Sequence, residues 1–388
     1  MTRHDLIALG VVVIFVAGCG GPPVLANPPA QPPVATPGVA PSPSRLPDPQ
    51  PVVLPADDAP HERLTEWWYY TGHLHDQAGN RYGFEFVVFR AERGTFPVAW
   101  ASHFAVTDET GKRFIYGQRS EVGPQVDRSA SGRAAGFDFA LGRQTAPTAT
   151  AWTLTGSNGI DRLAAMLTPE EARTAGVTGL ALELSLRSTK PAALHDHDGW
   201  IDFGSAGGSY YYSRTRMTAD GDLVLDGKHL LVDGEAWFDH QWGDFIAVGG
   251  GGWDWFAVNL ADGTDLTLSL VRDRDGSYPL VYGTRVDPDG TTHHLDRSAF
   301  SVEVTEHWTS PVTGATYPAG WRVSVPEPGL DLRLTPTVPD QELDTRATSG
   351  VVYWEGSQRV VATDRGNSVG GQAYVELTGF GPAASAAP

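Results

Sequence analysis

Cysteine is almost absent from this chain: among its 388 residues, only Cys19 carries a thiol. A single thiol can form no disulfide within the chain and cannot supply the several sulfur ligands of a cysteine metal site. The folded part must therefore be held together by its hydrophobic core. We expect neither a metal site nor a cofactor.

Positive charge is also scarce. Lys and Arg together number 28 against 46 Asp and Glu, which gives a formal net charge of −18. A chain with this excess of negative charge is repelled by phosphate backbones and by anionic lipid headgroups. We therefore exclude nucleic acid as a partner. An acidic surface is ordinary for an exported domain and points to no particular partner.

Three widespread functional motifs are missing as well. The sequence contains no Rossmann glycine pattern, no phosphate-binding loop and no Gly-x-Ser-x-Gly nucleophile elbow. This disfavours dinucleotide chemistry, nucleoside triphosphate chemistry and hydrolysis by an elbow serine.

Long apolar runs are lacking too. The stretch from Leu6 to Ala17 is shorter than the roughly 20 residues of a membrane-spanning helix. Small residues and a lone cysteine follow it, in the lipobox pattern Val16-Ala17-Gly18-Cys19. We predict that residues 1–18 are a lipoprotein signal peptide and that Cys19 is lipidated, which anchors an exported protein to the outer face of a cell membrane. The alternatives are an uncleaved anchor or a buried thiol.

Proline is abundant in one segment only. It recurs every few residues between Gly21 and Pro60. Because proline lacks an N–H and fixes φ, this stretch cannot build a helix or a central strand. We predict that residues 19–60 form an extended, disordered tether, which at about 3 Å per residue reaches on the order of 100 Å.

The rest of the chain is long enough for two domains, and its pattern is that of β-strands. Strands are predicted at Tyr82–Arg90 and Trp100–Asp108, and again at Trp255–Leu260 and Asp265–Arg272. Many strands joined by short turns predict an all-β protein built of sandwiches or up-and-down barrels.

Turn and helix signals divide these strands. Ala219-Asp220-Gly221 and Asp226-Gly227 each predict a tight turn. Only Pro169–Arg173 suggests a short helix. The four glycines Gly249–Gly252 predict a flexible crossing, either a mobile lid or a domain linker.

Aromatic residues gather in three runs, at Glu66–His73, Trp237–Asp244 and Gly252–Phe256. Each run mixes large rings with carboxylates or imidazoles, as in a ligand pocket lined by aromatic side chains and a few polar groups. An aromatic-rich β core would show the same composition. Period-two alternation places Glu66, Trp68 and Tyr70 on one face of the first run.

These runs and four further stretches resemble the carotenoid 1,2-hydratase (hydroxyneurosporene synthase) family, also called AttH-like, over nearly all of residues 60–381. The resemblance implies two tandem lipocalin-like antiparallel β-barrel domains, at 61–244 and 245–381, and a disordered tail at 382–388. The stretches that carry it are Glu66–Leu74, Tyr82–Glu85, Tyr210–Ser213, Trp237–Gly243, Gly252–Trp255, Tyr353–Gly356 and Gly371–Gly379.

The residues themselves permit acid catalysis. Asp254 shares a strand face with Phe256, and in an apolar barrel desolvation would raise its pKa, so that it could protonate an alkene. His240 shares a face with Trp242 and could orient water or relay a proton. Aromatic faces could stabilise a carbocation by about 1–2 kcal/mol each.

The resemblance assigns catalytic roles to the same groups. The His, Trp and Asp proposed as catalytic in the hydratases fall here on His240, Trp242 and Asp254, and their meeting in space is implied by the resemblance alone. We expect the surrounding ligand contacts to come from Glu66, Trp68, Tyr70, His103, Tyr211 and Trp255.

Each of these residues also has a structural interpretation. Glu66 could accept an indole hydrogen bond or pair with Arg90. His240 could be a hydrogen-bonded core histidine. Asp254 could cap a turn or pair with an arginine. Tyr211 could serve strand packing.

The remaining histidines favour structural interpretations. His103 alternates with alanines and fits a satisfied buried imidazole. The run His195-Asp196-His197-Asp198 could bind a metal, but a solvated loop is the preferred interpretation. His293-His294 is interpreted as a surface turn.

Two functions therefore stay open. The first is a hydro-lyase or isomerase that acts on an apolar polyene or terpenoid-like molecule by acid-catalysed hydration or isomerisation in a β-barrel pocket. The second is a non-catalytic lipocalin-like lipoprotein that binds or carries an apolar ligand, in one version together with ABC transporter components. Neither requires a cofactor.

Overall fold

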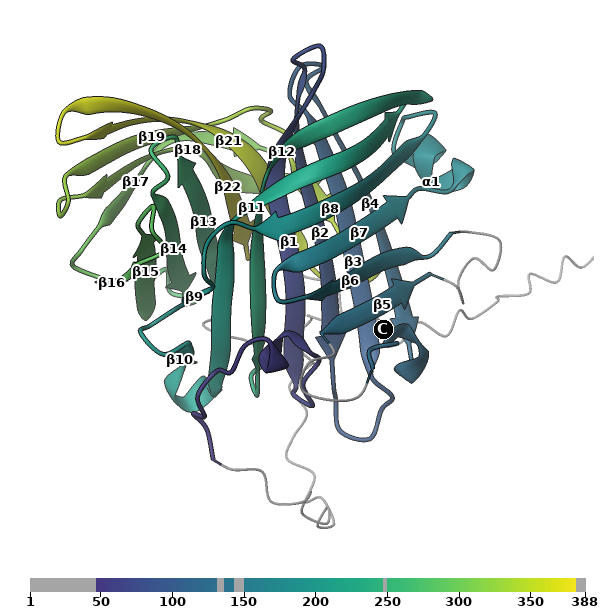
Figure 1. The fold of residues 1–388 in the computed structure, drawn as a ribbon, viewed down its shortest axis with the longest axis horizontal. Helices are drawn as coiled ribbons and strands as arrows, with labels where there is room; N and C mark the ends of the chain where they lie inside the picture. Colours follow the sequence, from purple (N-terminus) through teal and green to yellow (C-terminus); the bar gives the residue numbers. More distant parts are fainter. Residues whose placement is uncertain (1–46, 131–135, 143–149, 247–249, 382–388) are drawn as a thin grey trace, which may run out of the picture.

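The computed structural model describes residues 47–130, 136–142, 150–246 and 250–381. Within them the chain forms two curled antiparallel sheets that lie side by side, as Figure 1 shows. This confirms the predicted all-β architecture of two barrel-like units in tandem. The predicted signal peptide, Cys19 and the tail at 382–388 lie outside the described residues.

The first sheet has 12 strands, in the spatial order β4-β3-β2-β1-β12-β11-β8-β7-β6-β5, with β9 and β10 paired to β11. Its strands are β1 (Thr65–Asp76), β2 (Arg81–Ala91), β3 (Ala99–Asp108), β4 (Arg113–Val122), β5 (Phe137–Leu141), β6 (Trp152–Ser157), β7 (Ile160–Met166), β8 (Leu180–Ser188), β9 (Ala193–Leu194), β10 (Trp200–Asp202), β11 (Gly208–Leu225) and β12 (Lys228–Gly243).

The second sheet has 10 strands, in the order β16-β15-β14-β13-β22-β21-β19-β18-β17, with β20 paired to β21. They are β13 (Gly252–Leu260), β14 (Asp265–Arg272), β15 (Leu280–Val286), β16 (Thr292–Asp296), β17 (Ser301–Thr309), β18 (Thr316–Val325), β19 (Leu330–Pro336), β20 (Glu342–Asp344), β21 (Val352–Asp364) and β22 (Asn367–Thr378).

Helices are few in the described part of the chain. The predicted short helix is present as α1 (Pro169–Thr174), which Thr168 caps. Three single 3₁₀ turns accompany it: η1 (Ala56–Asp58), η2 (Pro124–Val126) and η3 (Gly204–Ala206). None of the helices in these residues has the length and apolar character needed to cross a membrane.

Strand β1 explains why aromatic residues follow one another without polar interruption. Trp68 and Tyr70 point into the core of the first sheet. Tyr69 points the other way, into a separate apolar cluster with Trp237 and Trp255 between the sheets. A strand covered on both faces buries every side chain, so it reads as a continuous apolar run.

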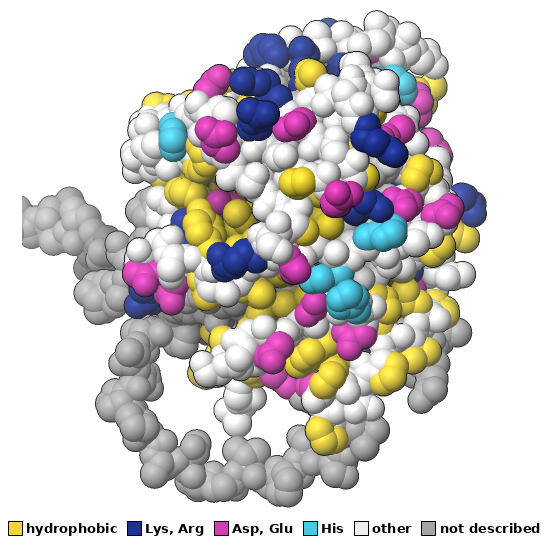
Figure 2. All heavy atoms as spheres, turned by 90° about the vertical axis from the view of Figure 1, so that its left-hand side faces the viewer, with side chains coloured by type: hydrophobic (Ala, Val, Ile, Leu, Met, Phe, Trp, Pro, Cys, Tyr) yellow, Lys and Arg dark blue, Asp and Glu magenta, His cyan; other side chains and the backbone are white. Residues whose placement is uncertain are grey.

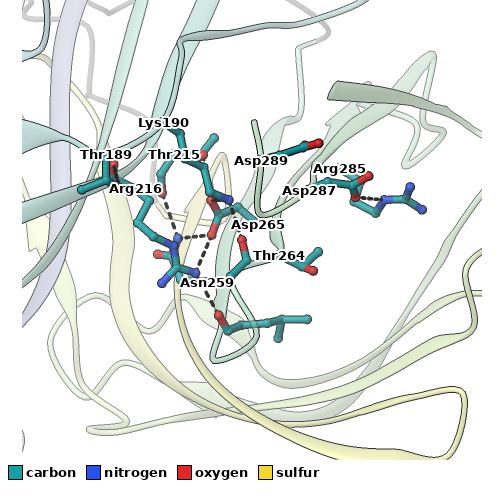
Figure 3. Close-up of polar contacts among 12 residues, drawn as sticks. Thr189, Lys190, Thr215, Arg216, Asn259, Thr264, Asp265, Arg285, Asp287 and Asp289 are labelled. Carbon is teal, nitrogen blue, oxygen red and sulfur yellow. Dashed lines mark hydrogen bonds and ion pairs between the residues drawn. The ribbon is translucent and has the colours of Figure 1, made fainter. Parts of the chain in front are cut away.

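The two sheets are also held together by polar contacts around the buried carboxylate of Asp265, shown in Figure 3. Lys190 Nζ and Arg216 Nη2 of the first domain each lie 2.7 Å from a different Asp265 oxygen. Thr215 Oγ1 donates at 2.8 Å and Asn259 Nδ2 at 2.7 Å. A buried charge with this many partners fixes the position of one sheet on the other, because losing any partner leaves it under-satisfied.

The prediction of a disordered tether up to residue 60 is wrong for residues 47–60, which pack on the first sheet. Asp48 accepts two hydrogen bonds from the guanidinium of Arg63, at 2.6 and 2.7 Å. Asp58 is fully buried, where Tyr212 donates to it at 2.5 Å and Arg214 at 2.8 Å. Proline prevents helix and sheet formation, but it does not prevent carboxylates in the same segment from pairing with distant residues. Proline content alone therefore did not predict that residues 47–60 are ordered.

Two of the predicted turns also need correction, and a third is confirmed. The expected turn at Ala219–Gly221 lies inside the long strand β11, where a Cβ at Gly221 would meet the carbonyl oxygen of Glu183 at 1.9 Å. That glycine serves close strand approach instead of a turn. The turn at Asp226-Gly227 is confirmed, with φ of 52° and 76°. His293 and His294 form part of strand β16 instead of a surface turn.

Candidate functional site

The first group of predicted site residues lies in the interior of the first sheet, around Glu66. Strand pairing places His240 of β12 beside Trp68 of β1. Glu66 Oε1 lies 2.9 Å from His240 Nε2 and 2.7 Å from His61 Nδ1. Trp242 stacks on His61 with ring centroids 4.2 Å apart, and Trp68 stacks on His240 at 4.6 Å.

The charges in this Glu66 cluster compensate one another. Burial alone would raise the pKa of Glu66, but the charge of His61 and the hydrogen bonds from both imidazoles outweigh it, so the pKa is lowered. Burial lowers the pKa of His240. Burial opposes the charged form of His61 too, yet Glu66 and Asp57 raise its pKa. Glu66 is therefore an anion in a satisfied network, and aromatic rings fill the space around His240.

A pocket lies between the two sheets, on the other face of β1 and β12. Its cavity volume is about 90 Å³, in a measure in which one water takes roughly 10–15 Å³. The pocket is narrow and mostly aromatic, and it receives side chains from both sheets. Its principal rings are Trp67, Tyr69, Phe89, Tyr211, Trp253 and Trp255.

Three carboxyl groups line this aromatic pocket: Glu85, Asp239 and Glu376. Burial raises the pKa of Glu85 to about 8 and that of Glu376 to about 7. Burial raises the pKa of Asp239 to about 6, against hydrogen bonds that favour the anion. Glu355 lies behind the pocket and accepts from Tyr69 at 2.7 Å; burial raises its pKa well above the usual range.

Glu85 has the most unusual surroundings of the three. Tyr353 donates to its Oε1 at 2.8 Å, while its buried Oε2 has no hydrogen-bond partner among the described residues. His103 Nδ1 lies 2.7 Å from the Tyr353 hydroxyl, and burial lowers the pKa of His103 to about 3. With only neutral neighbours in hydrogen-bond contact, Glu85 stays protonated at neutral pH and presents a free O–H.

Asp239 is the best-satisfied acid of the pocket. Tyr211 donates to its Oδ2 at 2.6 Å and Trp237 Nε1 to its Oδ1 at 2.7 Å, and Ser213 donates to Oδ1 as well. Trp255 Nε1 in turn donates to the Tyr211 hydroxyl at 3.0 Å. These bonds lock one wall of the pocket.

The structure does not bring Asp254 to His240. As its alternation predicts, Asp254 shares a face with Phe256, which lies in the core of the second sheet. Arg272 Nε donates to Asp254 Oδ1 at 3.1 Å. Burial raises the pKa of Asp254 to about 6, as expected for a desolvated carboxyl, but its side chain points away from Trp255 and the pocket.

The predicted ligand contacts thus fall into two places. Glu66, Trp68 and Tyr70 belong to the interior of the first sheet, with Trp242 and His240. Tyr211 and Trp255 line the pocket between the sheets, and His103 stands behind Glu85 through Tyr353.

Sequence reasoning missed the acids of the pocket. Glu85 lies between Phe84 and Phe86, and Glu376 between Val375 and Leu377. A carboxylate in the middle of an apolar strand is the signal that could have identified them, because Asp and Glu are seldom fully buried in a protein unless they are paired.

Two groups in the described residues have the donor atoms to hold a metal ion. One is His61, Glu66 and His240, and the other is Asp196, His197 and His294. The first is already satisfied as an ion pair. The second includes Asp196 and His197 of the loop that was predicted to be solvated. That prediction is only partly correct, because His195 of this loop is fully buried and hydrogen-bonded to Thr284 and Ser213.

The chain is similar to known proteins in both sequence and fold. No curated protein sequence matches the chain. A protein described as AttH from Nitrosomonas europaea has 27% identity and a TM-score of 0.72, over 86% of this chain and 98% of that one.

Two other crystal structures share the fold at lower identity. Kievitone hydratase from Nectria haematococca has 16% identity and a TM-score of 0.61, over 84% of this chain and 93% of its own. A structure of CghA with Sch210972 has 11% identity and a TM-score of 0.51, over 81% and 88%. The AttH-like family model matches residues 45–380. The chain therefore belongs to the AttH-like family.

Proposed function

We propose that this protein binds an apolar, unsaturated small molecule in the pocket between its two sheets and transfers a proton to it, as a hydratase or isomerase. The proposal depends mainly on Glu85, a buried carboxylic acid that lines the pocket and has one oxygen without a hydrogen-bond partner among the described residues. A neutral acid in an apolar site is the form of carboxyl group able to protonate an alkene near pH 7.

The proton transfer follows from the placement of that acid. The O–H bond at Glu85 Oε2 breaks as a C–H bond forms at one alkene carbon, which leaves a carbocation and the Glu85 carboxylate. In a hydration, water adds to the cation and its surplus proton returns to Glu85. In an isomerisation, an adjacent C–H proton returns to Glu85 and the double bond moves. Either route restores the acid.

Aromatic side chains support the charged intermediate. Trp67 and Phe89 of the first sheet face the same cavity as Trp253 and Trp255 of the second. A cation held against such faces is stabilised by about 1–2 kcal/mol per ring when water is excluded. The Tyr353 hydroxyl donates to Oε1 of Glu85 and so leaves Oε2 as the oxygen that can carry the transferred proton.

The family supports a reaction of this kind. A neighbour in fold, kievitone hydratase, is named for a hydration. Export and anchoring through Cys19 belong to the proposal as well, since a lipidated protein would meet apolar molecules at a membrane. The proposal requires neither a carotenoid nor a transporter component.

The deciding experiment follows proton transfer in heavy water. Tag-free protein is incubated in D₂O with an apolar membrane extract and with a panel of isoprenoid alkenes and polyenes, and products are read by mass spectrometry. We expect deuterium on carbon in the wild-type reaction, and a loss of about 10²–10⁴-fold in rate for Glu85→Gln. The matched control is Glu355→Gln, an equally buried acid that does not line the pocket, which should keep its rate within about tenfold.

The outcomes separate catalysis from carriage. If Glu85→Gln retains the ligand but not the turnover, the proton-donor role stands. If an unsaturated molecule co-purifies unchanged, takes up no deuterium and binds equally to both variants, the protein is a carrier. Equal rates for wild type and Glu85→Gln would remove Glu85 from the chemistry.

A further inference from the structure

We propose that Asp196, His197 and His294 form a binding site for a divalent transition metal ion of the zinc class. Asp196 and His197 lie in the loop between β9 and β10 of the first sheet, while His294 lies on β16 of the second. One ligand atom from each residue lies within 4.8 Å of the other two. The ion would thus join segments of two separate sheets.

The spacing of the donor atoms suits a small ion. Zinc binds histidine nitrogen and carboxylate oxygen at about 2.0–2.2 Å in tetrahedral geometry, which separates neighbouring ligand atoms by about 3.4 Å. His294 Nδ1 lies 3.5 Å from Asp196 Oδ1, close to this edge length. The His197 ring lies beside that of His294, with centroids 4.6 Å apart, so small rotations bring its nitrogen to the same centre.

The donors of this site have unused capacity. His294 Nδ1 is buried and makes no hydrogen bond with any described residue. Its separation from Asp196 is longer than an ordinary hydrogen bond. A buried donor or acceptor without a partner is destabilising, and a metal ion bound between the two groups would satisfy both.

The chemistry of the set selects the class of ion. Two imidazoles and one carboxylate suit zinc and its neighbours in the first transition series better than calcium or magnesium, which prefer oxygen alone. The Asp196 side chain is 42% exposed and that of His294 16%, so an ion reaches the site from solvent. Figure 2 shows the adjoining face, where histidine and acidic side chains lie next to one another. A water would complete four-coordination.

The site is connected to the wall of the aromatic pocket. His195, next to Asp196, packs its ring on Tyr211 with centroids 4.0 Å apart. Its Nε2 lies 2.7 Å from the hydroxyl of Ser213 and its Nδ1 2.8 Å from that of Thr284, which pairs with His294 across β15 and β16. An ion at this position would therefore stiffen the joint between the sheets.

The test measures metal binding directly and needs no substrate, so its outcome is independent of the proton-transfer activity. Tag-free protein, stripped with chelator, is titrated with Zn²⁺ by calorimetry and with Co²⁺ by visible absorption. We expect one ion per chain and a four-coordinate cobalt spectrum. His197→Ala and His294→Ala should each weaken binding by at least about tenfold.

Two control variants make the result specific. His293→Ala changes the adjacent histidine, which bonds Asp287 at 2.8 Å, and should bind as the wild type does. His61→Ala changes the buried Glu66 cluster and should also leave the affinity unchanged. His197 is exposed, so its variant decides the matter if His294→Ala unfolds. A wild type without stoichiometric binding, unchanged affinity in His197→Ala, or loss of the ion in His61→Ala would each overturn the proposal.

Discussion

Glu66 and Glu85 lie on neighbouring strands of one sheet, are both buried, and yet adopt opposite charge states. Glu66 points into the first core and touches the imidazoles of His61 and His240, so its pKa is lowered. Glu85 lines the pocket, where burial and the negative charge of Glu376 raise its pKa to about 8, against the hydrogen bond that it accepts from the Tyr353 hydroxyl. Burial acts on both, and the charge of the partner decides between anion and acid.

Because Glu66 is ionised and Glu85 is protonated, we assign a structural role to the Glu66 cluster and a chemical role to Glu85. The Glu66 cluster contains the histidine and tryptophan that the sequence pointed to, but aromatic rings surround its imidazole. Glu85 lines a cavity, and its Oε2 accepts no hydrogen bond from the part of the chain that the structure describes. Three experiments test this contrast.

The largest effect is expected from breaking the ionic cluster. His240→Ala removes one of the two imidazole hydrogen bonds to the buried Glu66 anion and leaves a space among the aromatic rings, and together these cost about 3–5 kcal/mol of unfolding free energy. Chemical denaturation measures the loss. The double variant with Glu66→Gln should lose less than the sum of the single variants, by about 0.5–3 kcal/mol. Simple additivity would show that Glu66 and His240 do not depend on each other for stability.

A smaller effect is expected from pH. The folded pKa of Glu85 is raised from 4.5 to about 8, so the folded state keeps a proton that the unfolded chain has released. Its contribution to stability is present below pH 4.5 and is lost as the pH rises to about 8, with a slope of about 1.4 kcal/mol per pH unit. Glu376 and Asp239 act in the same direction up to about 7 and 6.

Denaturation curves at several pH values between 5 and 8 check this slope. Glu85→Gln removes one titrating group while keeping the shape of the side chain, so its stability should fall less steeply with pH than that of the wild type. Parallel curves for the two proteins would mean that Glu85 is ionised in the fold, which would remove the contrast with Glu66.

The smallest effect is expected from Asp254→Asn. Since Asp254 points into the second core beside Arg272, the substitution should change turnover by less than about threefold, or about 0.6 kcal/mol in activation free energy. The assay is the deuterium incorporation used for Glu85→Gln. A loss of several hundredfold would restore Asp254 as the proton donor and contradict the assignment to Glu85.

Much of this architecture could be predicted from the sequence. The two-residue period correctly places Trp68 and Tyr70 together, and Asp254 with Phe256. Motif similarity pointed to the family. The site was less predictable, because alternation shows which residues share a face but not what that face covers. His61, at the first position of the predicted first domain, was not among the predicted site residues, yet it is a partner of Glu66.

The sequence by itself determined the all-β class and the faces of the aromatic strands, because these depend on local period and on turn residues, and its resemblance to a known family implied the two-barrel plan. Only the tertiary structure decided which buried acids are charged. Glu66 meets His240 across 174 positions, and Glu85 meets Tyr353 across 268. A carboxyl pKa depends on atoms within a few ångströms, and strand pairing chooses those atoms from distant parts of the chain.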